Sequence, residues 1–339
     1  MVTRKEVAEL AGVSVAAVSY VINNKGGVSE ATRLKITQAI ETLGYKPSYA
    51  ARMLKAQKTN HLTVLINYLG DPFEAGLLIG LESRARERGY FIDIQTYSPE
   101  WEDEFIEHSS SRIDGVILLG QSLRQETLDA LHKQSIPLLS IGKPCSTEGI
   151  LAYVDIDWVE SYTRLIRHLL REGYRKIRYM NNGTAGHIHE MRREAFHHAV
   201  KNIQAEEAFI FEDVMCGSGR LEAAYQAMIE HLSATIEPEV DHEGATAYVA
   251  ASDLMAGGML HACSEKGRHV PNGIGVAASE NILMMSIMTP SVTALDYPRQ
   301  QAGSMAIDLM VDYLHGEPVE NQILSCDFHI RDSTLLSTN

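Results

Sequence analysis

The sequence has few of the residues that mark secreted, membrane-bound or metal-binding proteins. Its four cysteines, Cys145, Cys216, Cys263 and Cys326, form no CxxC or Cys/His spacing in 339 residues. A zinc site or redox pair needs such a spacing, so we expect free, buried thiols in a reducing cytoplasm and no metal. The first nine residues are polar and charged, unlike a signal peptide. No apolar run approaches the roughly 18–20 residues of a membrane helix, so we expect no membrane partner.

Motifs for catalysis and cofactor binding are also missing. Gly217-Ser218-Gly219 begins a GxGxxG-like run, which ends at Glu222 where a dinucleotide site needs glycine. In "HIHEMRR", Arg193 stands where the zinc motif HExxH has its second histidine. The chain contains no Walker loop and no Gly-x-Ser-x-Gly elbow. We therefore expect neither an enzyme nor a cofactor.

Charge is divided unevenly along the chain. The net charge is −14, yet residues 1–60 contain nine Lys or Arg against four Glu. A basic head on an acidic body indicates a polyanionic partner for the head alone. A merely solvated basic surface is the alternative, and the helical pattern of the head decides between the two.

The head begins with two short helical patterns joined by a tight turn. Thr3 and Glu6 form a capping box, and Gly12 ends the first helix because it adopts a left-handed cap easily. Ser14 is placed to cap the second helix. Helical spacing predicts that Val7, Leu10 and Ala11 of the first helix and Val18, Val21 and Ile22 of the second face inward. The other face of the second helix then presents small or hydrogen-bonding residues: Val15, Ala16, Ser19, Tyr20 and Asn23.

A third helix follows from Ser29 to Gly44, with Leu34, Ile40 and Leu43 predicted inward. Three short helices with this turn fit a helix-turn-helix domain, although a generic three-helix bundle is the alternative. In a helix-turn-helix the second helix enters the major groove. Hydroxyls such as Ser14, Ser19 and Thr32, with the helix N-termini, are then suited to hold phosphates.

The stretch "VAELAGVSVAAVSYVINNKGGVSEATRLKI" resembles the DNA-binding head of the LacI/GalR transcriptional repressors, and "LGYKPSYAARMLKAQKTN" resembles their hinge. The resemblance implies that Val15 and Ala16 choose the operator. Ala17, Tyr20 and Ser48 depart from the family's usual Thr, Arg and Asn, so the operator sequence is not implied. The DNA-contacting residues that we expect are Thr3, Ser14, Val15, Ala16, Ser19, Tyr20, Asn23, Ser29, Thr32 and Leu54.

The hinge, residues 47–60, is short, polar and basic. A lone helix of this length is marginal in water. The resemblance implies that the hinge orders on DNA beside its dimer mate, where Leu54 wedges between base steps of the minor groove. A disordered tether is the alternative. Paired hinges imply a homodimer on a near-palindromic operator of double-stranded DNA.

The rest of the chain alternates apolar β-type runs with helical patterns. The first series is "LTVLINYL", "GYFIDIQTY", "DGVILLG", "IPLLSIG" and "AYVDI"; the second is "KIRYMNN", "EAFIFED", "TAYVAAS", "GIGVAAS" and "SVTALDY". This alternation predicts two doubly wound parallel sheets with a ligand cleft at the carboxyl ends of their strands.

This half resembles the periplasmic-binding-protein-like core of the same family. The predicted architecture is therefore an all-α helix-turn-helix head (1–46), a hinge helix (47–60) and a two-lobed α/β core (61–339). The resemblance implies chain crossings near residues 160, 290 and 320. Lobe one would then contain residues 61–160 and 291–320, and lobe two residues 161–290 and 321–339.

The resemblance implies an effector site between the lobes. A sugar is the expected effector, with a nucleobase or a phosphosugar as the alternatives. Arg192 matches the ligand-clamping arginine, with Arg193 as its competitor; Glu280 and Ser252 match ligand-contacting Asp and Asn. Phe73 offers a stacking face or a core ring, and Asp157 a ligand contact or a helix N-cap. Trp158 is expected to pack. The expected effector site is Phe73, Asp157, Arg192, Ser252 and Glu280.

Two classes of function fit this architecture. The first is a cytoplasmic, ligand-controlled transcriptional repressor. The second is a metabolite-binding protein or an enzyme on the same doubly wound fold. The basic head and the absence of a catalytic constellation favour the repressor.

Overall fold

The computed structural model describes residues 2–23, 26–45, 58–109, 112–183, 187–234, 240–241 and 244–336. It divides into two units, Met1–Thr59 and Asn60–Asn339, each with its own apolar cluster. Leu54 and the expected hinge helix lie outside the described residues. No helix in the described part of the chain is long and apolar enough to cross a bilayer.

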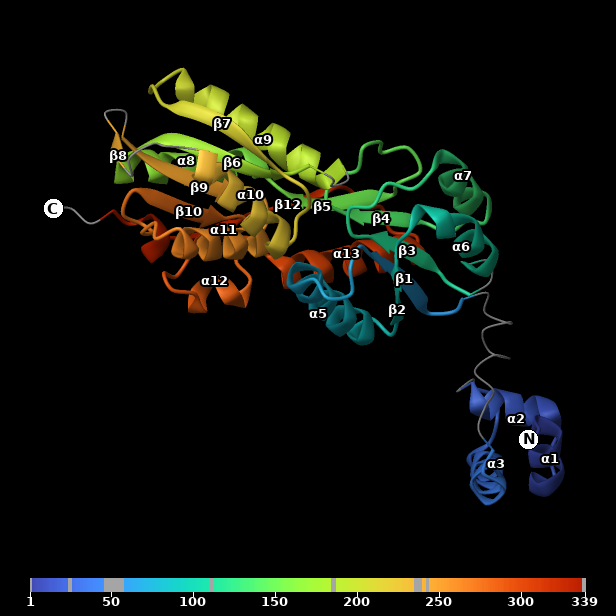
Figure 1. The fold of residues 1–339 in the computed structure, drawn as a ribbon. Helices are drawn as coiled ribbons and strands as arrows, with labels where there is room; N and C mark the ends of the chain where they lie inside the picture. Colours follow the sequence, from blue (N-terminus) through green and yellow to red (C-terminus); the bar gives the residue numbers. More distant parts are fainter. Residues whose placement is uncertain are drawn as a thin grey trace. The chain divides into compact units, whose positions relative to one another are not determined.

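The first unit is a three-helix head. Thr3 and Glu6 form the expected capping box, and Gly12 ends the first helix with φ of 64°. The Ser14 hydroxyl accepts from the Ala17 N–H at 3.2 Å, and Ser29 caps the third helix. The helices are α1 (Arg4–Ala11), α2 (Val15–Ile22) and α3 (Glu30–Leu43) (Figure 1).

Two leucines expected in the core of the head are on its surface. Leu10 is 54% and Leu34 61% exposed, and both predictions were wrong. At 100° per residue, Leu34 lies 200° around α3 from the buried Ile36, so the two cannot share a face. In α1 the inward position belongs to Ala8, whose small side chain suits the packing of α1 against α3. The buried apolar residues of the head, as far as the structure describes it, are Val7, Ala8, Val18, Ile36, Ala39 and Tyr45.

Lobe one of the core is a six-stranded, all-parallel sheet in the order β12-β5-β4-β3-β1-β2. Its strands are β1 (His61–Ile66), β2 (Phe91–Thr96), β3 (Gly115–Leu118), β4 (Leu138–Ile141), β5 (Ala152–Ile156) and β12 (Gln322–Leu324). Its helices are α5 (Pro72–Glu87), α6 (Glu102–Ser109), α7 (Gln125–Lys133) and α13 (Arg299–Leu314), with a 3-10 turn at Pro99–Trp101. The helices α5 and α13 pack against each other (Figure 1).

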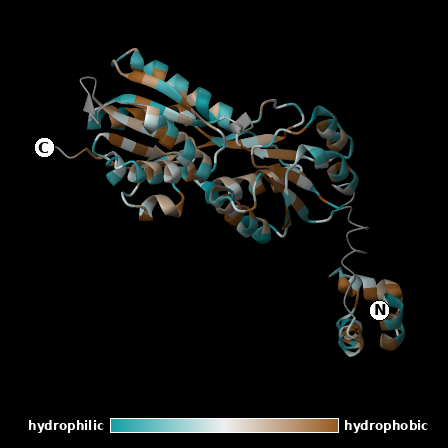
Figure 2. Ribbon diagram, viewed as in Figure 1, coloured by the Kyte–Doolittle hydropathy of each residue, from teal (hydrophilic) through white to brown (hydrophobic). Residues whose placement is uncertain are grey.

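Lobe two contains the second sheet, in the order β13-β11-β10-β9-β6-β7, with β8 beside β9. Its strands are β6 (Tyr174–Asn182), β7 (Ile210–Cys216), β8 (Val240–Asp241), β9 (Gly244–Ala250), β10 (Ile274–Ala278), β11 (Thr293–Asp296) and β13 (Asp327–His329). Its helices are α8 (Trp158–Glu172), α9 (His187–Gln204), α10 (Leu221–Ala234), α11 (Asp253–Glu265) and α12 (Leu283–Ile287), with a 3-10 turn at Asp332–Thr334. Figure 2 shows hydrophobic residues gathered along the strands, as expected of sheets buried on both faces.

The chain crosses between the lobes three times: after β5, after β11 and between β12 and β13. The last two crossings come later than the expected positions 290 and 320. Strand β11, which the expected ranges assign to lobe one, hydrogen-bonds in the sheet of lobe two. Strand β12, assigned to lobe two, lies in the sheet of lobe one. Each of these strands belongs to the sheet with which its backbone forms hydrogen bonds. The apolar pattern of the sequence does not say which of the two sheets that is.

Candidate functional site

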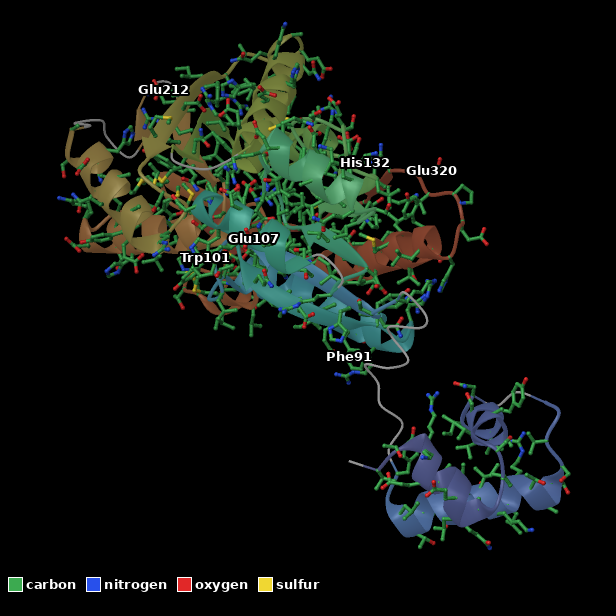
Figure 3. The ribbon with its side chains drawn as sticks, turned by 90° about the vertical axis from the view of Figure 1, so that its right-hand side faces the viewer. Phe91, Trp101, Glu107, His132, Glu212 and Glu320 are labelled. Atoms are coloured by element: carbon green, nitrogen blue, oxygen red, sulfur yellow. The ribbon has the colours of Figure 1, made fainter. Side chains whose placement is uncertain are left out.

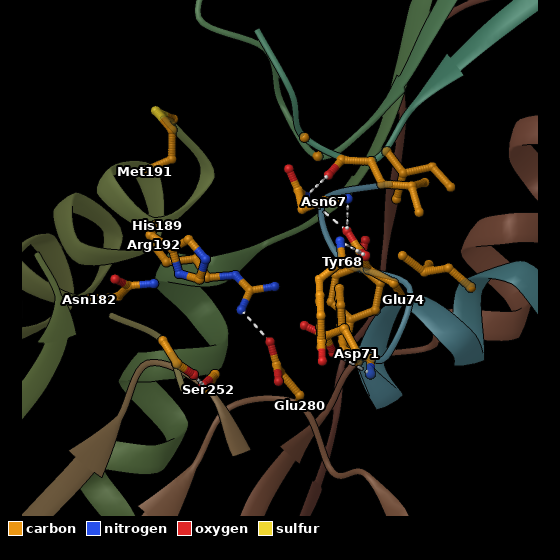
Figure 4. Close-up of a pocket in the computed structure, with 18 of the residues that line it drawn as sticks. Asn67, Tyr68, Asp71, Glu74, Asn182, His189, Met191, Arg192, Ser252 and Glu280 are labelled. Carbon is orange, nitrogen blue, oxygen red and sulfur yellow. Dashed lines mark hydrogen bonds and ion pairs between the residues drawn. The ribbon is translucent and has the colours of Figure 1, made fainter. Parts of the chain in front are cut away.

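The carboxyl ends of both sheets open into one cavity of about 470 Å³. From lobe one its wall includes Tyr68 after β1 and Lys143 after β4; from lobe two it includes Ser252 after β9 and Glu280 after β10. Parallel strands place their carboxyl ends at one edge of a sheet, where ligands of doubly wound folds bind. Figure 4 shows the labelled side chains converging on this space from both lobes.

Arg192 and Glu280 form a buried ion pair at the centre of the cavity wall. Arg192 Nη1 donates to Glu280 Oε1 at 2.7 Å and to the Ala251 carbonyl at 3.3 Å, and the two side chains are only 4% and 7% exposed. Burial opposes the charge of Arg192, but the carboxylate of Glu280 raises the pKa of Arg192 overall. The guanidinium lies 4.3 Å from the centre of the Trp158 ring and 5.2 Å from that of Phe73. Its Nε has no hydrogen-bond partner among the described residues. The pair, drawn as a dashed line in Figure 4, therefore offers one donor to a ligand that rearranges this wall.

Asp253 holds the backbone behind Glu280. Its carboxylate accepts from the Glu280 N–H at 2.9 Å and from the Ile282 N–H at 2.6 Å. Burial raises the pKa of Asp253, and the nearby charge of Glu280 raises it further. Burial also raises the pKa of Glu280, although Arg192 opposes that shift. The loop after β10 is thus fixed by hydrogen bonds that position Glu280 toward Arg192.

Two further buried carboxylates line the side of the cavity that lobe one forms. Glu74 accepts from the backbone N–H groups of Asn67 and Tyr68 at 2.9 and 3.0 Å. Asp155 accepts from the Lys143 N–H at 3.1 Å and from Trp158 Nε1 at 3.1 Å. Burial raises the pKa of each of these carboxyl groups. Each carboxylate retains lone pairs that suit the hydroxyl groups of a ligand.

Of the five expected effector residues, the cavity brings together Phe73, Arg192, Ser252 and Glu280, but not Asp157. Asp157 caps α8 by accepting from the Glu160 N–H at 2.9 Å, so its expected place in the cavity was wrong. Its short side chain turns back to the helix it starts. Asp155, two residues earlier at the end of β5, lines the cavity instead.

The sequence left open whether three side chains face the cavity, and the structure shows where each of them lies. Arg193 pairs with Asp213 at 3.0 Å and does not line the cavity, so of these two neighbours Arg192 is the one in the cavity wall. Phe73 both packs on the core and lines the cavity. Trp158 packs as expected and also forms part of the wall.

Several cavity residues have no motif that would have identified them, and His189 is the most unusual. Burial and the positive charge of Arg192 lower the pKa of His189 to about 3, so its imidazole is neutral at neutral pH. The Nδ1 atom of His189 has no hydrogen-bond partner in the described structure. Six such residues share one sequence signal, a position in the carboxyl-terminal half of a predicted strand or in the loop after it: Asn67, Tyr68, Lys143, Asp155, Asn182 and Arg220.

The head presents the face of α2 that the sequence predicts. Val15, Ala16, Tyr20 and Asn23 are exposed, and Ser19 is half-buried. The amide of Asn23 donates to the Ser19 carbonyl at 2.8 Å and so is held in place at the end of α2. Four of the expected DNA-contacting residues place their hydroxyls at helix starts: Thr3, Ser14, Ser29 and Thr32.

Comparison with known proteins covers both units. Residues 3–48 match the family model "Bacterial regulatory proteins, lacI family", and residues 166–334 match the model "Periplasmic binding protein-like domain". The chain is 27% identical to catabolite control protein A of Priestia megaterium over 98% of this chain and 99% of that protein. It is similar to the transcriptional regulator CelR–cellobiose complex, with a TM-score of 0.69 and 26% identity over 98% of this chain and 100% of that one. It shares the fold of the lac repressor dimer bound to operator and the anti-inducer ONPF, with a TM-score of 0.84 and 22% identity over 99% of both chains.

Proposed function

Because the chain belongs to the LacI family of bacterial regulatory proteins, we propose that it represses transcription from an operator whose affinity is controlled by a sugar bound between the lobes. It acts in the cytoplasm, where that DNA is. The full-length relatives that it matches are regulators and not enzymes. The observation that carries the proposal is the pairing, in one chain, of an exposed α2 face on a basic head with a polar cavity between two lobes.

The head binds operator DNA through the major groove. Val15, Ala16, Tyr20 and Asn23 meet base edges, and Ser19 supports them. Thr3, Ser14, Ser29 and Thr32 stand at helix starts, where hydroxyls and N–H groups suit phosphate oxygens. Leu54, from the hinge outside the described residues, completes the proposed contact set in the minor groove.

The cavity binds the effector. A sugar needs groups that hydrogen-bond its hydroxyls and an apolar face for its C–H surface. Arg192, Glu280, Ser252 and Asp155 supply the first, and Phe73 supplies the second. The CelR–cellobiose complex among the similar structures supports a sugar as the ligand class.

A homodimer gives the two head copies that a near-palindromic operator requires. Apolar side chains exposed on the core support it. Leu283 and Ile287 of α12 are 78% and 71% exposed, and Phe91, labelled in Figure 3, stands exposed on the edge strand β2. Monomeric proteins rarely expose such apolar groups together, so we assign both faces to the partner subunit. Relative movement of the lobes around the effector then changes the spacing of the two hinges.

The test is selection of a binding sequence from random duplex DNA, followed by affinity measurement on the purified full chain. Tyr20→Ala is expected to weaken binding to the selected site about 10-fold or more, since a base-edge contact is worth roughly 1–3 kcal/mol. Tyr313→Ala is the matched control, because Tyr313 lies in the effector-binding unit and is about as exposed as Tyr20 (45% against 48%). It should leave the affinity for DNA unchanged. Affinity should fall steeply with salt as phosphate contacts release counterions. Failure to select any sequence, or a flat salt profile, would reject DNA as the partner.

A further inference from the structure

Two cations in the cavity wall, Lys143 and Arg220, have no carboxylate partner among the residues that the structure describes. We propose that the effector is an anionic sugar derivative whose acidic group is bound by Lys143 and Arg220. The inference rests on the proposed sugar site and narrows its ligand class. It follows from how the other charges of the cavity are used.

Among the described residues, the inner part of the cavity has no cation that is available to an anion. Arg192 is neutralised by Glu280 at 2.7 Å, and its guanidinium lies 4.3 Å and 5.2 Å from the ring centres of Trp158 and Phe73. The neutral His189 adds no charge beside it. Asp155 and Glu74 are acceptors, and like charge disfavours an anion next to them. This part of the wall suits hydroxyl groups.

Lys143 stands at the carboxyl end of β4, in lobe one. Its backbone N–H donates a hydrogen bond to Asp155 Oδ2, which holds the backbone of Lys143 in place. The side chain of Lys143 is exposed. In the described structure its ammonium forms no ion pair and no hydrogen bond. A cation held at a cavity edge without a counter-charge is a natural partner for an acidic group of the ligand.

Arg220 approaches the same cavity from lobe two, in the loop before α10. Its guanidinium lies 4.7 Å from the centre of the ring of Tyr68, which belongs to lobe one. Among the described residues no carboxylate pairs with it; Asp71, also in the wall, uses its Oδ1 to accept from the Phe73 N–H at 2.8 Å. Arg220 therefore touches both lobes while keeping its donors free. An anion bound there contacts one lobe through Lys143 and the other through Arg220, and so favours the lobe arrangement that holds both.

Phosphate esters and carboxylates share this chemistry, and titration calorimetry on the full chain separates them. The probes are glucose and ribose, glucose 6-phosphate and ribose 5-phosphate, glucuronate, and inorganic phosphate alone. We expect at least one anionic sugar to bind 10-fold or more tightly than its parent sugar. Tighter binding of the ester identifies a phosphate, and tighter binding of glucuronate identifies a carboxylate.

The variant Lys143→Gln/Arg220→Gln should bind that anionic sugar no more tightly than it binds the parent sugar. Lys201→Gln/Lys266→Gln, which removes two exposed lysines outside the cavity, is the matched control and should retain the preference. A preference that survives in the cavity variant would place the anion elsewhere and overturn the inference.

The remaining outcomes separate this inference from the proposed function. Parent sugars that bind as tightly as their anionic derivatives would reject the anionic group and leave the sugar-controlled repressor standing. Inorganic phosphate that binds as tightly as the ester would reject the sugar part of the ligand. If no probe binds a chain that still binds its selected DNA, both the anionic ligand and the sugar effector are rejected, and DNA binding is not.

Discussion

At the scale of single residues, the cavity is organised by the charge of Arg192. That charge is almost completely buried, and a buried charge is tolerated only when it is paired and hydrogen-bonded. Glu280 pairs with it, Trp158 covers one face of the guanidinium, and His189 gives up its own proton beside it. The ion pair, the aromatic contact and the neutral imidazole together stabilise the buried positive charge of Arg192.

The first prediction concerns the acid side of the pH profile. Folded His189 takes up a proton only near its pKa of about 3, whereas an unfolded histidine does so near 6.5. Between these values the unfolded chain binds the extra proton, so His189 stabilises the folded chain above pH 6.5 and this stabilisation is lost as the pH falls toward 3. The slope is up to about 1.4 kcal/mol per pH unit. His189→Gln should therefore become steadily more stable relative to wild type as the pH is lowered from 7 to 5.

Urea unfolding of wild type and variant at several pH values measures this difference. His315→Gln removes an exposed histidine at the end of α13 and controls for loss of an imidazole as such. A stability difference between His189→Gln and wild type that is constant with pH would contradict the buried, neutral state of His189.

Sequence reasoning reached part of this site. Arg192, Ser252 and Glu280 were identified because they match a family pattern, and the cavity contains all three. Asp155 and Asp157 are both carboxylates near a strand end, and the sequence does not say which turns to the cavity and which caps a helix. Lys143, His189 and Arg220 carry no motif, because their role depends on which side chains pack around them.

At the scale of elements, two pairs of helices lie unusually close. A Cβ on Gly80 of α5 would lie 2.1 Å from the Gln300 carbonyl oxygen of α13, and a Cβ on Gly258 of α11 would lie 2.2 Å from the Leu221 carbonyl oxygen of α10. Backbones can approach this closely only where no side chain separates them. These glycines therefore set the distance between neighbouring helices in each lobe.

The element-scale prediction is that Gly80→Ala destabilises the core by about 1–3 kcal/mol, because the methyl group overlaps backbone that cannot move alone. Helix propensity alone predicts the opposite sign, a gain of about 1 kcal/mol. Gly76→Ala, one turn earlier in α5, is the control: the three atoms nearest to its new methyl group belong to the Arg299 side chain and not to backbone, so they can shift. Urea unfolding should show a clear loss for Gly80→Ala and a change of less than about 1 kcal/mol for Gly76→Ala. Equal effects would refute the close backbone contact.

Elements were predicted well where pattern is strong and poorly where it is short. Each of the ten apolar runs overlaps an observed strand, because buried parallel strands read as continuous apolar sequence. The strands β8, β12 and β13 were missed, since two or three residues carry no periodicity and form only where a neighbouring strand offers hydrogen bonds. Leu10 and Leu34 misled the prediction because hydrophobic character alone does not fix the side of a short helix.

At the scale of the whole molecule, the chain contains two units whose apolar cores are separate. Ile36 is fully buried in the head, and Leu81 is fully buried in lobe one of the core. A small head has little stability to spare, because a domain of this size buries a limited share of its surface. The two units should therefore respond independently to damage.

Scanning calorimetry tests this independence with two variants that are controls for each other. Ile36→Ala should cost the head about 2–5 kcal/mol and lower or abolish its transition without moving that of the core. Leu81→Ala should lower the core transition by a similar free energy and leave the head transition in place. A variant that shifts both transitions together would show that the units unfold as one.

The last crossing between the lobes has a consequence for how the protein is made. Strands β12 and β13, within residues 322–329, add to the sheet of lobe one and to the sheet of lobe two in turn. Neither sheet has its full set of strands until this segment has left the ribosome, so the nascent chain cannot finish one lobe before it begins the other. A stop codon before position 322 therefore removes an edge strand from each lobe. A reporter protein fused at that point would follow two incomplete sheets.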